Sequence, residues 1–270
     1  MRIATWNLLH GMAIPPRPAK HQEDFCALCQ FIANEIKPDL ITFQEIDNFQ
    51  VRSGNIEQIK TIATALDAHY FFYAPSILGT PGEKWEKHPT HSTHIETVFG
   101  NSRTQKPSYG LGIVSKVPVI NWEILPLGRS LVGLPLAVPK ENGKGVRFIY
   151  VKDEPRIALA AILGNGVTVI ATHLSFVPLV NLFQLRKMKK WAATLPGEAI
   201  IMGDLNLPWG LPARGKWRSL IKDLTYPSWG AKVQFDYILS NSQKLKVKTV
   251  KRPKASGFSD HLPLIVDIRL

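Results

Sequence analysis

Four apolar segments of this chain each end in a polar residue that can take part in catalysis or metal binding. The segments are short enough to be buried strands, and the residues that follow them are Asn7, Glu45, His173 and Asp204. Strand ends of a packed sheet can present several side chains to one cleft. We therefore predict that these four residues share a site, which restricts the fold to one that brings four distant strand ends together.

Strands and helices alternate along the chain, which is typical of an α/β fold. With 270 residues and 45% hydrophobic content, one large core is possible, and we predict a single domain over 1–270. Many later strands are joined by turns, which favours antiparallel pairing. The patterns predict helices near 22–36, 54–67, 179–194 and 213–224, and strands at the start of the chain and near 39–45, 109–115, 118–125, 147–152, 157–163, 167–172, 199–203, 232–239, 245–250 and 262–268.

The region 157–194 combines an uncharged run with a basic helix. Residues 157–185 contain no Asp, Glu, Lys or Arg, which would fit a membrane span, but Gly164-Asn165-Gly166 is typical of a hairpin turn, so we predict no span. In the helix predicted at 179–194, we expect buried apolar residues on one face and exposed basic residues on the other. The expected buried set is Leu182, Phe183, Met188 and Trp191, and the expected exposed set is Arg186, Lys187, Lys189 and Lys190.

A long loop or insertion is predicted at about 75–108, where Gly, Pro, His, Thr and Ser replace the apolar periodicity. Such a loop can shape access to a site. His88, His91 and His94, with Glu96 nearby, would offer zinc ligands if they folded together. Solvated loop histidines are the alternative that the Ser- and Thr-rich context favours.

The two cysteines and the start of the chain bear on the compartment. Cys26 and Cys29 lie in a segment with helical periodicity, and we expect half-buried helix residues in a reducing environment rather than a redox or zinc site. The chain opens without the basic-then-apolar layout of a secretory signal. We therefore expect a cytoplasmic protein.

The charge balance of 33 Lys plus Arg against 21 Asp plus Glu gives +12, which favours a polyanionic or phosphate-bearing partner. Arg214 and Arg218 flank Trp217 near Asp204, where an arginine could bind phosphate and an indole could stack on a base; Trp209 and Trp229 could contribute. Near the end of the chain, a second basic cluster fits either a polyanion or a solvated edge strand equally well. This cluster comprises Lys244, Lys246, Lys248, Lys251, Arg252 and Lys254.

Two further motifs complete an ordered set. Asp204 and Asn206 lie two residues apart, so an extended backbone would point them the same way, and Ser259-Asp260-His261 precedes an apolar strand. Each motif alone is uninformative. In order, however, Trp-Asn, Gln-Glu, Thr-His, Gly-Asp-Leu-Asn, Asp-Tyr-Ile-Leu and Ser-Asp-His run from residue 5 to residue 261. This ordered set resembles the endonuclease/exonuclease/phosphatase superfamily of metal-dependent phosphoesterases.

The resemblance implies a four-layer sandwich of two packed, mostly antiparallel β-sheets flanked by helices. It also implies a Mg²⁺ site, with Mn²⁺ as a possible substitute, in which Glu45 is the principal ligand and Asn7 and Asp260 lie close to the metal. The remaining roles serve in-line attack on phosphorus. Asp204 would orient or deprotonate the attacking water, Asn206 would hold that water or a phosphate oxygen, His261 would contact the scissile phosphate, Asp236 would orient His261, and His173 would donate a further hydrogen bond.

Two residues have open roles. Arg156 stands where relatives often carry an arginine, so it would contact phosphate, pair with a carboxylate, or simply lie on the surface at a strand start. Many nuclease relatives have an acidic or amide residue where this chain has Leu9, so a second metal ligand there is in doubt. His10 would either line the pocket or bond to backbone in a loop.

The expected activity is hydrolysis of a phosphoester, with nucleic acid as the first candidate substrate because the positive charge and the motif set converge. A phospholipid, inositol phosphate or other small phosphoester is the alternative. A nucleic-acid-binding module without catalysis is the third reading. No protein partner is predicted.

Overall fold

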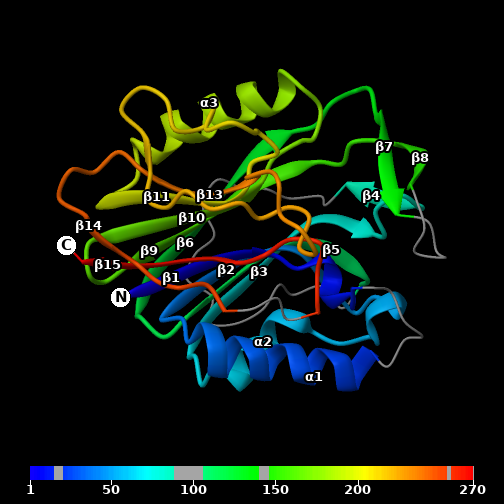
Figure 1. Ribbon diagram of the computed structural model, residues 1–270, viewed down its shortest axis with the longest axis horizontal. Coiled ribbons are helices and arrows are strands. Elements are labelled where there is room, and N and C mark those ends of the chain that lie inside the picture. Colours follow the sequence, from blue (N-terminus) through cyan, green and yellow to red (C-terminus); the bar gives the residue numbers. More distant parts are fainter. Residues whose placement is uncertain (15–20, 88–105, 140–145, 254–256, 270) are drawn as a thin grey trace.

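The computed structural model describes residues 1–14, 21–87, 106–139, 146–253 and 257–269. Within them, two large sheets lie face to face and helices cover their outer faces (Figure 1). Three separate apolar clusters fill the spaces between these layers. The prediction of a four-layer α/β sandwich is therefore confirmed.

The first sheet has seven described strands in the order β14-β15-β1-β2-β5-β3-β4. Among its described neighbours, β1 and β2 are parallel and the other pairs are antiparallel. The strands span Arg2–Asn7 (β1), Leu40–Asn48 (β2), Tyr70–Gly79 (β3), Trp85–Lys87 (β4), Ser108–Ser115 (β5), Lys246–Thr249 (β14) and Leu264–Arg269 (β15).

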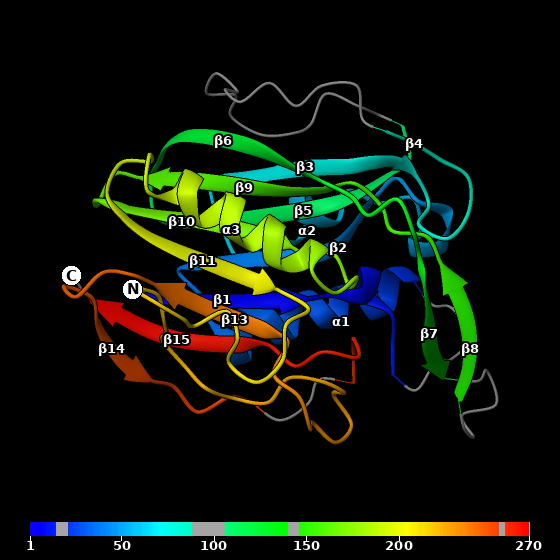
Figure 2. The same ribbon diagram turned by 90° about the horizontal axis from the view of Figure 1, so that it is seen from above.

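The second sheet has six described strands in the order β12-β13-β11-β10-β9-β6, and here β10 and β11 are the parallel pair. A two-stranded ribbon, β7 with β8, extends beyond the end of both sheets (Figure 2). The strands span Val119–Gly128 (β6), Leu134–Pro139 (β7), Val146–Val151 (β8), Arg156–Leu163 (β9), Val167–His173 (β10), Glu198–Asp204 (β11), Arg218–Ser219 (β12) and Asp236–Ser240 (β13).

Helices α1 (His21–Phe31) and α2 (Gln58–Ala65) cover the first sheet, and α3 (Val180–Ala192) covers the second. A π-helical turn at Ile32–Ile36 continues α1, and 3₁₀ turns lie at Leu9–Gly11 and Val51–Ser53. Both cysteines lie in α1 as predicted, but neither is half-buried: Cys29 is buried and Cys26 is exposed, both as free thiols. No helix in the described ranges is long and apolar enough to cross a membrane.

Two predicted elements need correction, the helix at 213–224 and the loop at 75–108. The segment 213–224 contains turns and the short strand β12 instead of a helix. Trp217 and Leu220, which gave the segment its apolar periodicity, are buried although the backbone around them is not helical. Residues 75–79 belong to β3, where Pro75 sits next to a register shift. Residues 85–87 form β4, so the predicted loop is shorter. Its section 88–105, which contains the three histidines, lies outside the described residues. Lys254 lies outside them too.

Helix α3 is present, but its buried face differs from the prediction. Phe183 is 68% exposed, whereas Gln184 and Asn181 are buried. The Gln184 side chain accepts a hydrogen bond from the Ser175 amide and donates one to the Gly128 carbonyl, so amide groups connect this end of the helix to the sheet alongside the buried Leu185. Leu182 is likewise exposed, while Met188 is buried as expected.

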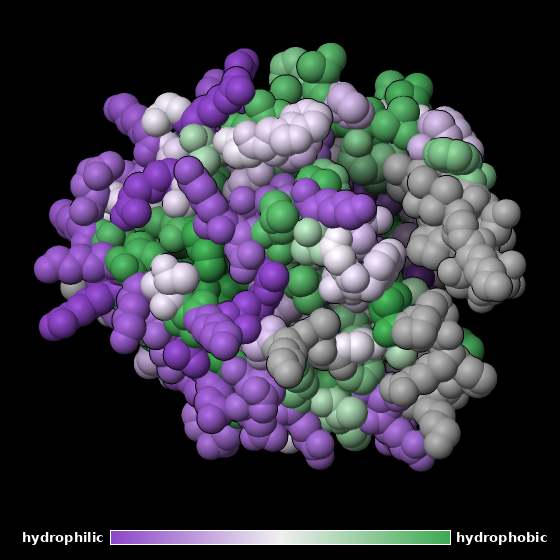
Figure 3. All heavy atoms as spheres, viewed as in Figure 1, coloured by the Kyte–Doolittle hydropathy of each residue, from purple (hydrophilic) through white to green (hydrophobic). Residues whose placement is uncertain are grey.

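At the outer edge of the first sheet, β14 exposes Lys246 and Lys248. Hydrophilic side chains gather over this edge of the molecule (Figure 3). Lys244, just before the strand, pairs with Glu198 at 3.2 Å. The solvated edge strand considered from the sequence is therefore present.

Candidate active site

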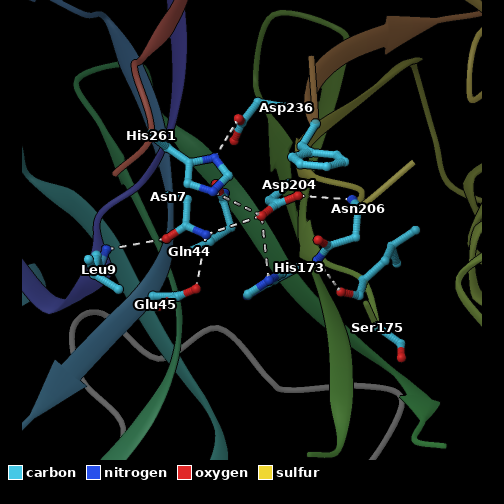
Figure 4. A network of polar contacts seen from close by, with 12 residues as sticks. Asn7, Leu9, Gln44, Glu45, His173, Ser175, Asp204, Asn206, Asp236 and His261 are labelled. Atoms are coloured by element: carbon cyan, nitrogen blue, oxygen red, sulfur yellow. Dashed lines mark hydrogen bonds and ion pairs between the residues drawn. The ribbon is translucent and has the colours of Figure 1, made fainter. Parts of the chain in front are cut away.

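Two parallel strand pairs, one in each sheet, end at the same place. Asn7 ends β1 beside Gln44 of β2, and His173 ends β10 beside Asp204 of β11. The amide nitrogen of Asn7 donates to Glu45 Oε1 at 3.0 Å in its own sheet and to Asp204 Oδ2 at 3.2 Å in the other (Figure 4). The four residues predicted to share a site are therefore in one cluster.

A β-bulge presents Glu45 to this cluster. The register of β2 against β5 shifts between Phe43 and Ile46, so two residues of β2 lie opposite one residue of β5. Glu45 has a φ of +56°, in the left-handed region that non-glycine residues seldom adopt. Backbone strain of this kind persists only where the surrounding structure holds it, and it is common at functional sites.

Asp204 occupies the centre of the cluster. Its Oδ2 lies 3.6 Å from His173 Nε2 and 3.7 Å from His261 Nε2, and its Oδ1 accepts the Asn206 amide at 2.9 Å. Burial raises the pKa of this carboxyl to about 6, although the nearby His261 opposes the rise. A carboxyl with that pKa can accept a proton near neutral pH.

Gly203 allows Asp204 to reach this position. Its φ is +142°, and a Cβ at this residue would lie 1.9 Å from the Thr172 carbonyl oxygen of β10. Only glycine therefore permits this approach of β11 to β10 without a shift of one strand.

His261 and Asp236 form a hydrogen-bonded pair, with 2.8 Å between Nδ1 and Oδ2. Burial alone would lower the pKa of the imidazole, but the carboxylates of Asp236, Asp204 and Asp260 outweigh it and raise the pKa to about 10. At neutral pH the ring is therefore a buried imidazolium that can donate from Nε2 toward Asp204 or a substrate oxygen. Tyr226 packs against it, with 5.0 Å between ring centroids.

Ser259 and Trp6, to which the sequence reading gave no role, hold the His261 segment. Ser259 has a φ of +58°, and its hydroxyl donates to the Asn7 carbonyl at 2.6 Å while it accepts the His261 amide at 3.1 Å. The indole of Trp6 donates to the His261 carbonyl at 2.9 Å. Both belong to motifs that carry a catalytic residue beside them, and that adjacency was the available signal.

The carboxyls of Glu45 and Asp260 form an acidic locus beside Asn7. Burial and then the charge of Asp260 raise the pKa of Glu45 to about 7, and burial also raises the pKa of Asp260. Partly buried carboxylates that repel each other gain from a shared cation, and oxygen donors are those that Mg²⁺ and Mn²⁺ prefer. The donor set therefore fits the metal predicted from the sequence.

A second group, Asp204, Asp236 and His261, has one potential ligand atom each within 4.8 Å of the others. In this group, Nδ1 of His261 is already bonded to Asp236, and a protonated imidazole has no lone pair for a metal. Asp236 also keeps a buried Oδ1 with no hydrogen-bond partner in the described structure. The chemistry of these donors fits proton transfer better than metal ligation.

His173 and Arg156 form the opposite wall and share a small cavity with Tyr109 and Ser76. Burial and the charge of Arg156 lower the pKa of His173 well below its usual value, which keeps the ring neutral. Arg156 is 4% exposed and pairs with Asp153 at 3.1 Å and with Glu154 at 2.9 Å. Of the roles considered, carboxylate pairing is present and a surface position is wrong.

The remaining predicted residues divide into two groups. Asn206 lies in the cluster, and its side chain donates to the Leu174 carbonyl at 3.0 Å; His10 lies in the 3₁₀ turn that follows β1, with a φ of +46°. Arg218 lies elsewhere. It is paired with Ser240, at the end of β13 that is far from Asp236, and it donates to the Ser242 and Leu245 carbonyls. A phosphate-binding Arg218 is therefore corrected to an arginine that holds a loop. Arg214 is exposed in the loop that follows Asn206.

The tryptophans of this region also divide. Trp217 is buried beneath the Lys189 ammonium, whose nitrogen lies 5.6 Å from the ring centroid. Trp209 and Trp229 are exposed. Trp209 lies three residues after Asn206, and Trp229 follows Ser228, whose amide donates to the Asp260 carbonyl at 2.7 Å.

Comparison with solved structures supports the fold. The chain is similar over 100% of its length to all of an endonuclease/exonuclease/phosphatase family protein from Leptotrichia buccalis (17% identity, TM-score 0.61) and to all of a mannosyl-6-phosphatase from Bacteroides thetaiotaomicron (13% identity, TM-score 0.57). It is also similar over 100% of its length to 99% of D. rerio TDP2 complexed with a single-strand DNA product (13% identity, TM-score 0.52).

Comparison with curated protein sequences finds no match. A family model described as Endonuclease/Exonuclease/phosphatase family, by contrast, matches residues 4–261, from β1 to the histidine bonded to Asp236. That match spans all four strand ends of the site. The chain belongs to the endonuclease/exonuclease/phosphatase family.

Proposed function

We propose that the protein is a Mg²⁺-dependent phosphodiesterase that cleaves nucleic acid, with Mn²⁺ as a substitute metal. The observation that carries this proposal is the position of Asp204 between a neutral imidazole, His173, and a charged one, His261, opposite the Glu45 and Asp260 carboxyls. Hydrolysis of a phosphodiester needs a base for water, a donor for the developing charge and a site for a cation. This cluster supplies all three types of group.

In this proposal, Asp204 orients the attacking water and accepts its proton, while Asn206 holds Asp204 through its backbone amide. The His261 imidazolium, oriented by Asp236, donates to a phosphoryl oxygen, and His173 adds a second hydrogen bond. Glu45 and Asp260, with Asn7 beside them, would hold the cation. When bound there, Mg²⁺ supplies Lewis-acid stabilisation of the phosphoryl charge.

Nucleic acid is the substrate class favoured by the surface around the site. The net charge of +12 attracts a polyanion, and Arg214 is an exposed cation on the loop after Asn206. Exposed indoles are also stacking partners for bases, and Trp209 and Trp229 lie on loops next to Asn206 and Asp260. The single-strand DNA product bound to D. rerio TDP2 belongs to a protein of the same fold.

A small phosphoester is the second candidate. The similarity to a mannosyl-6-phosphatase of the same fold is the observation that supports it. A phospholipid or an inositol phosphate falls in the same alternative class.

Both free thiols fit a reducing compartment, and we propose a cytoplasmic location.

The test is metal-dependent turnover on a panel of single- and double-stranded DNA, RNA, phospholipids and small phosphoesters. Glu45→Gln and His261→Ala should abolish turnover, and Lys248→Gln, on the outer edge strand, should retain it. Cleavage of nucleic acid that both variants lose would support the proposal. Turnover of another class alone would replace the substrate, and nucleic-acid binding without any turnover would identify a non-catalytic binding module.

A further inference from the structure

Large apolar side chains are exposed together at one end of the molecule. We call this surface the apolar end; its members are between 60% and 95% exposed, and they come from the connection between β6 and β7, from β8, and from the start of α3. Figure 3 shows hydrophobic side chains gathered over this end of α3 and the top of the ribbon. The apolar end comprises Leu131, Val132, Phe148, Tyr150, Leu179 and Phe183.

Hydrogen bonds hold these three segments side by side. The Tyr150 hydroxyl accepts the Gly133 amide at 2.9 Å, which ties β8 to the connection that carries Leu131 and Val132. Gln184 donates to the Gly128 carbonyl at 3.2 Å, which ties that connection to α3. Figures 1 and 2 both show the β6–β7 connection passing the start of α3. The exposed side chains therefore form one surface.

A buried carboxylate fixes the base of this surface. Asp153 accepts the Ser130 amide at 2.7 Å and the Ser175 hydroxyl at 2.8 Å, and its other oxygen pairs with Arg156. Ser130 and Ser175 begin the two segments that lead to Leu131 and Leu179. The apolar side chains are thus exposed from a well-bonded part of the fold.

Basic residues continue the surface along α3. Arg186, Lys187 and Lys190 are exposed in the turns that follow Phe183. The chain contains no Asp or Glu from residue 157 to residue 197, so no carboxylate in that stretch neutralises them. Arg129, at the start of the β6–β7 connection, is also exposed. The apolar end is therefore bordered by positive charge.

We infer that the apolar end docks the protein onto an anionic phospholipid bilayer. Leucine, valine and phenylalanine side chains gain from contact with acyl chains, tyrosine favours the membrane interface, and flanking Lys and Arg side chains bind acidic headgroups. A nucleic acid would use the cations, and its bases could stack on the aromatic rings, but it has no acyl chains to match Leu131, Val132 and Leu179. Patches of this kind on a monomer mark an interaction surface.

The inference does not depend on the substrate. The strand ends that carry the active site point toward the same side of the molecule as the β7–β8 ribbon (Figures 1 and 2). Docking through the apolar end would therefore hold the site close to the bilayer. It requires no transmembrane helix.

Sedimentation with phospholipid vesicles tests the inference. The wild-type protein should bind vesicles of equal parts phosphatidylglycerol and phosphatidylcholine, and bind phosphatidylcholine alone at least about tenfold more weakly. Leu131→Glu combined with Phe183→Glu should weaken binding to the anionic vesicles by at least about tenfold, because both changes place charge in the acyl region. Ile120→Glu, an exposed apolar position near the opposite end of β6, should bind like wild type.

Thermal unfolding of each variant should match the wild type, since the substituted side chains are exposed. Absence of wild-type binding, or equal binding by the double variant, would overturn the inference. A wild-type dimer that the double variant converts to a monomer would also overturn it, and would identify the apolar end as a self-association surface.

Discussion

At the scale of single residues, the surroundings of His173 and His261 decide which ring is protonated. The carboxylates of Asp236, Asp204 and Asp260 act on His261, whereas the charge of Arg156 acts on His173. Asp236 is buried and bonded to His261, so it favours the imidazolium. His173 faces Arg156 and stays neutral. Because Asp204 lies between the two rings, it has a charged donor on one side and a neutral one on the other. The two rings therefore differ in charge at neutral pH, which the sequence does not reveal.

Asp236→Asn should lower kcat by about a hundredfold or more, because the amide neither orients the imidazolium nor stabilises its charge. Removing that carboxylate also lowers the pKa of His261, so the basic limb of the pH–rate profile should move to lower pH. Asp223→Asn, which alters a half-exposed pair with Arg252, is the matched control. An unchanged basic limb in Asp236→Asn would show that His261 is not the titrating group.

The Glu45 carboxyl should make metal binding depend on pH. With a pKa raised from 4.5 to about 7, it holds a proton in the metal-free protein at acidic pH, and a cation must displace that proton. The increase in Tm caused by Mg²⁺ should therefore grow as pH rises toward about 7 and then level off. The metal-free protein should lose stability over the same range, because the folded state binds the proton more tightly than the unfolded one.

Calorimetric melting with and without Mg²⁺ across this range measures both effects. In Glu45→Gln the growth of the Mg²⁺ effect with pH should disappear, because the amide does not titrate. A Mg²⁺ effect that is equal at acidic and neutral pH in the wild type would contradict the assignment of Glu45 as the ligand.

At the scale of elements, close strand approach sets the position of Asp204. Gly203→Ala should destabilise the fold by about 2 kcal/mol or more, because the added Cβ meets the Thr172 carbonyl oxygen and because alanine would be strained at a φ of +142°. Gly128→Ala is the control, since its φ is also positive but nothing lies within 4 Å of the new atom; it should cost about 1 kcal/mol. Urea unfolding compares the two, and equal losses would refute a steric role for Gly203.

Arg156 also holds elements together. It pairs with Asp153, which in turn accepts hydrogen bonds from Ser130 and Ser175 in two other segments. Arg156→Met should cost about 3 kcal/mol or more, because two buried carboxylates lose their cation. Replacing Arg156 and Glu154 together by Met and Gln should recover part of the loss. If the single variant unfolds like the wild type in urea, the carboxylates protonate at little cost.

The sequence was sufficient for elements whose pattern is local and insufficient where partners are distant. Strand ends at Asn7 and Asp204 were predictable because an apolar run stops at a polar residue. The buried amides of α3 were not, because Gln184 owes its burial to Gly128, which lies far away in sequence. The bulge at Glu45 was hidden for the same reason: a register shift is a property of two strands. Arg218 was placed in the site by proximity in sequence, but β12 turns it away.

At the scale of the whole molecule, the charge of +12 should draw polyanions to the surface, but only some of its cations lie near the site. Lys246 of β14 lies opposite Arg269, at one end of β15. The other end of β15, at Leu264, lies beside Thr5 near the site. Arg214 is exposed, eight residues after Asn206 in the loop that follows it. Local cations and remote ones should therefore differ in what they contribute to binding.

Affinity for single-stranded DNA, measured without metal to prevent cleavage, should fall steeply with salt, with a slope in log K against log salt of about −0.7 for each phosphate contacted. Arg214→Gln should make that slope shallower by about one contact. Lys246→Gln combined with Lys248→Gln should leave it unchanged, although it removes twice the charge, because the edge strand lies beyond the strands that carry the site. The reverse result would place the DNA along β14, and the two exposed tryptophans would then lie off its path.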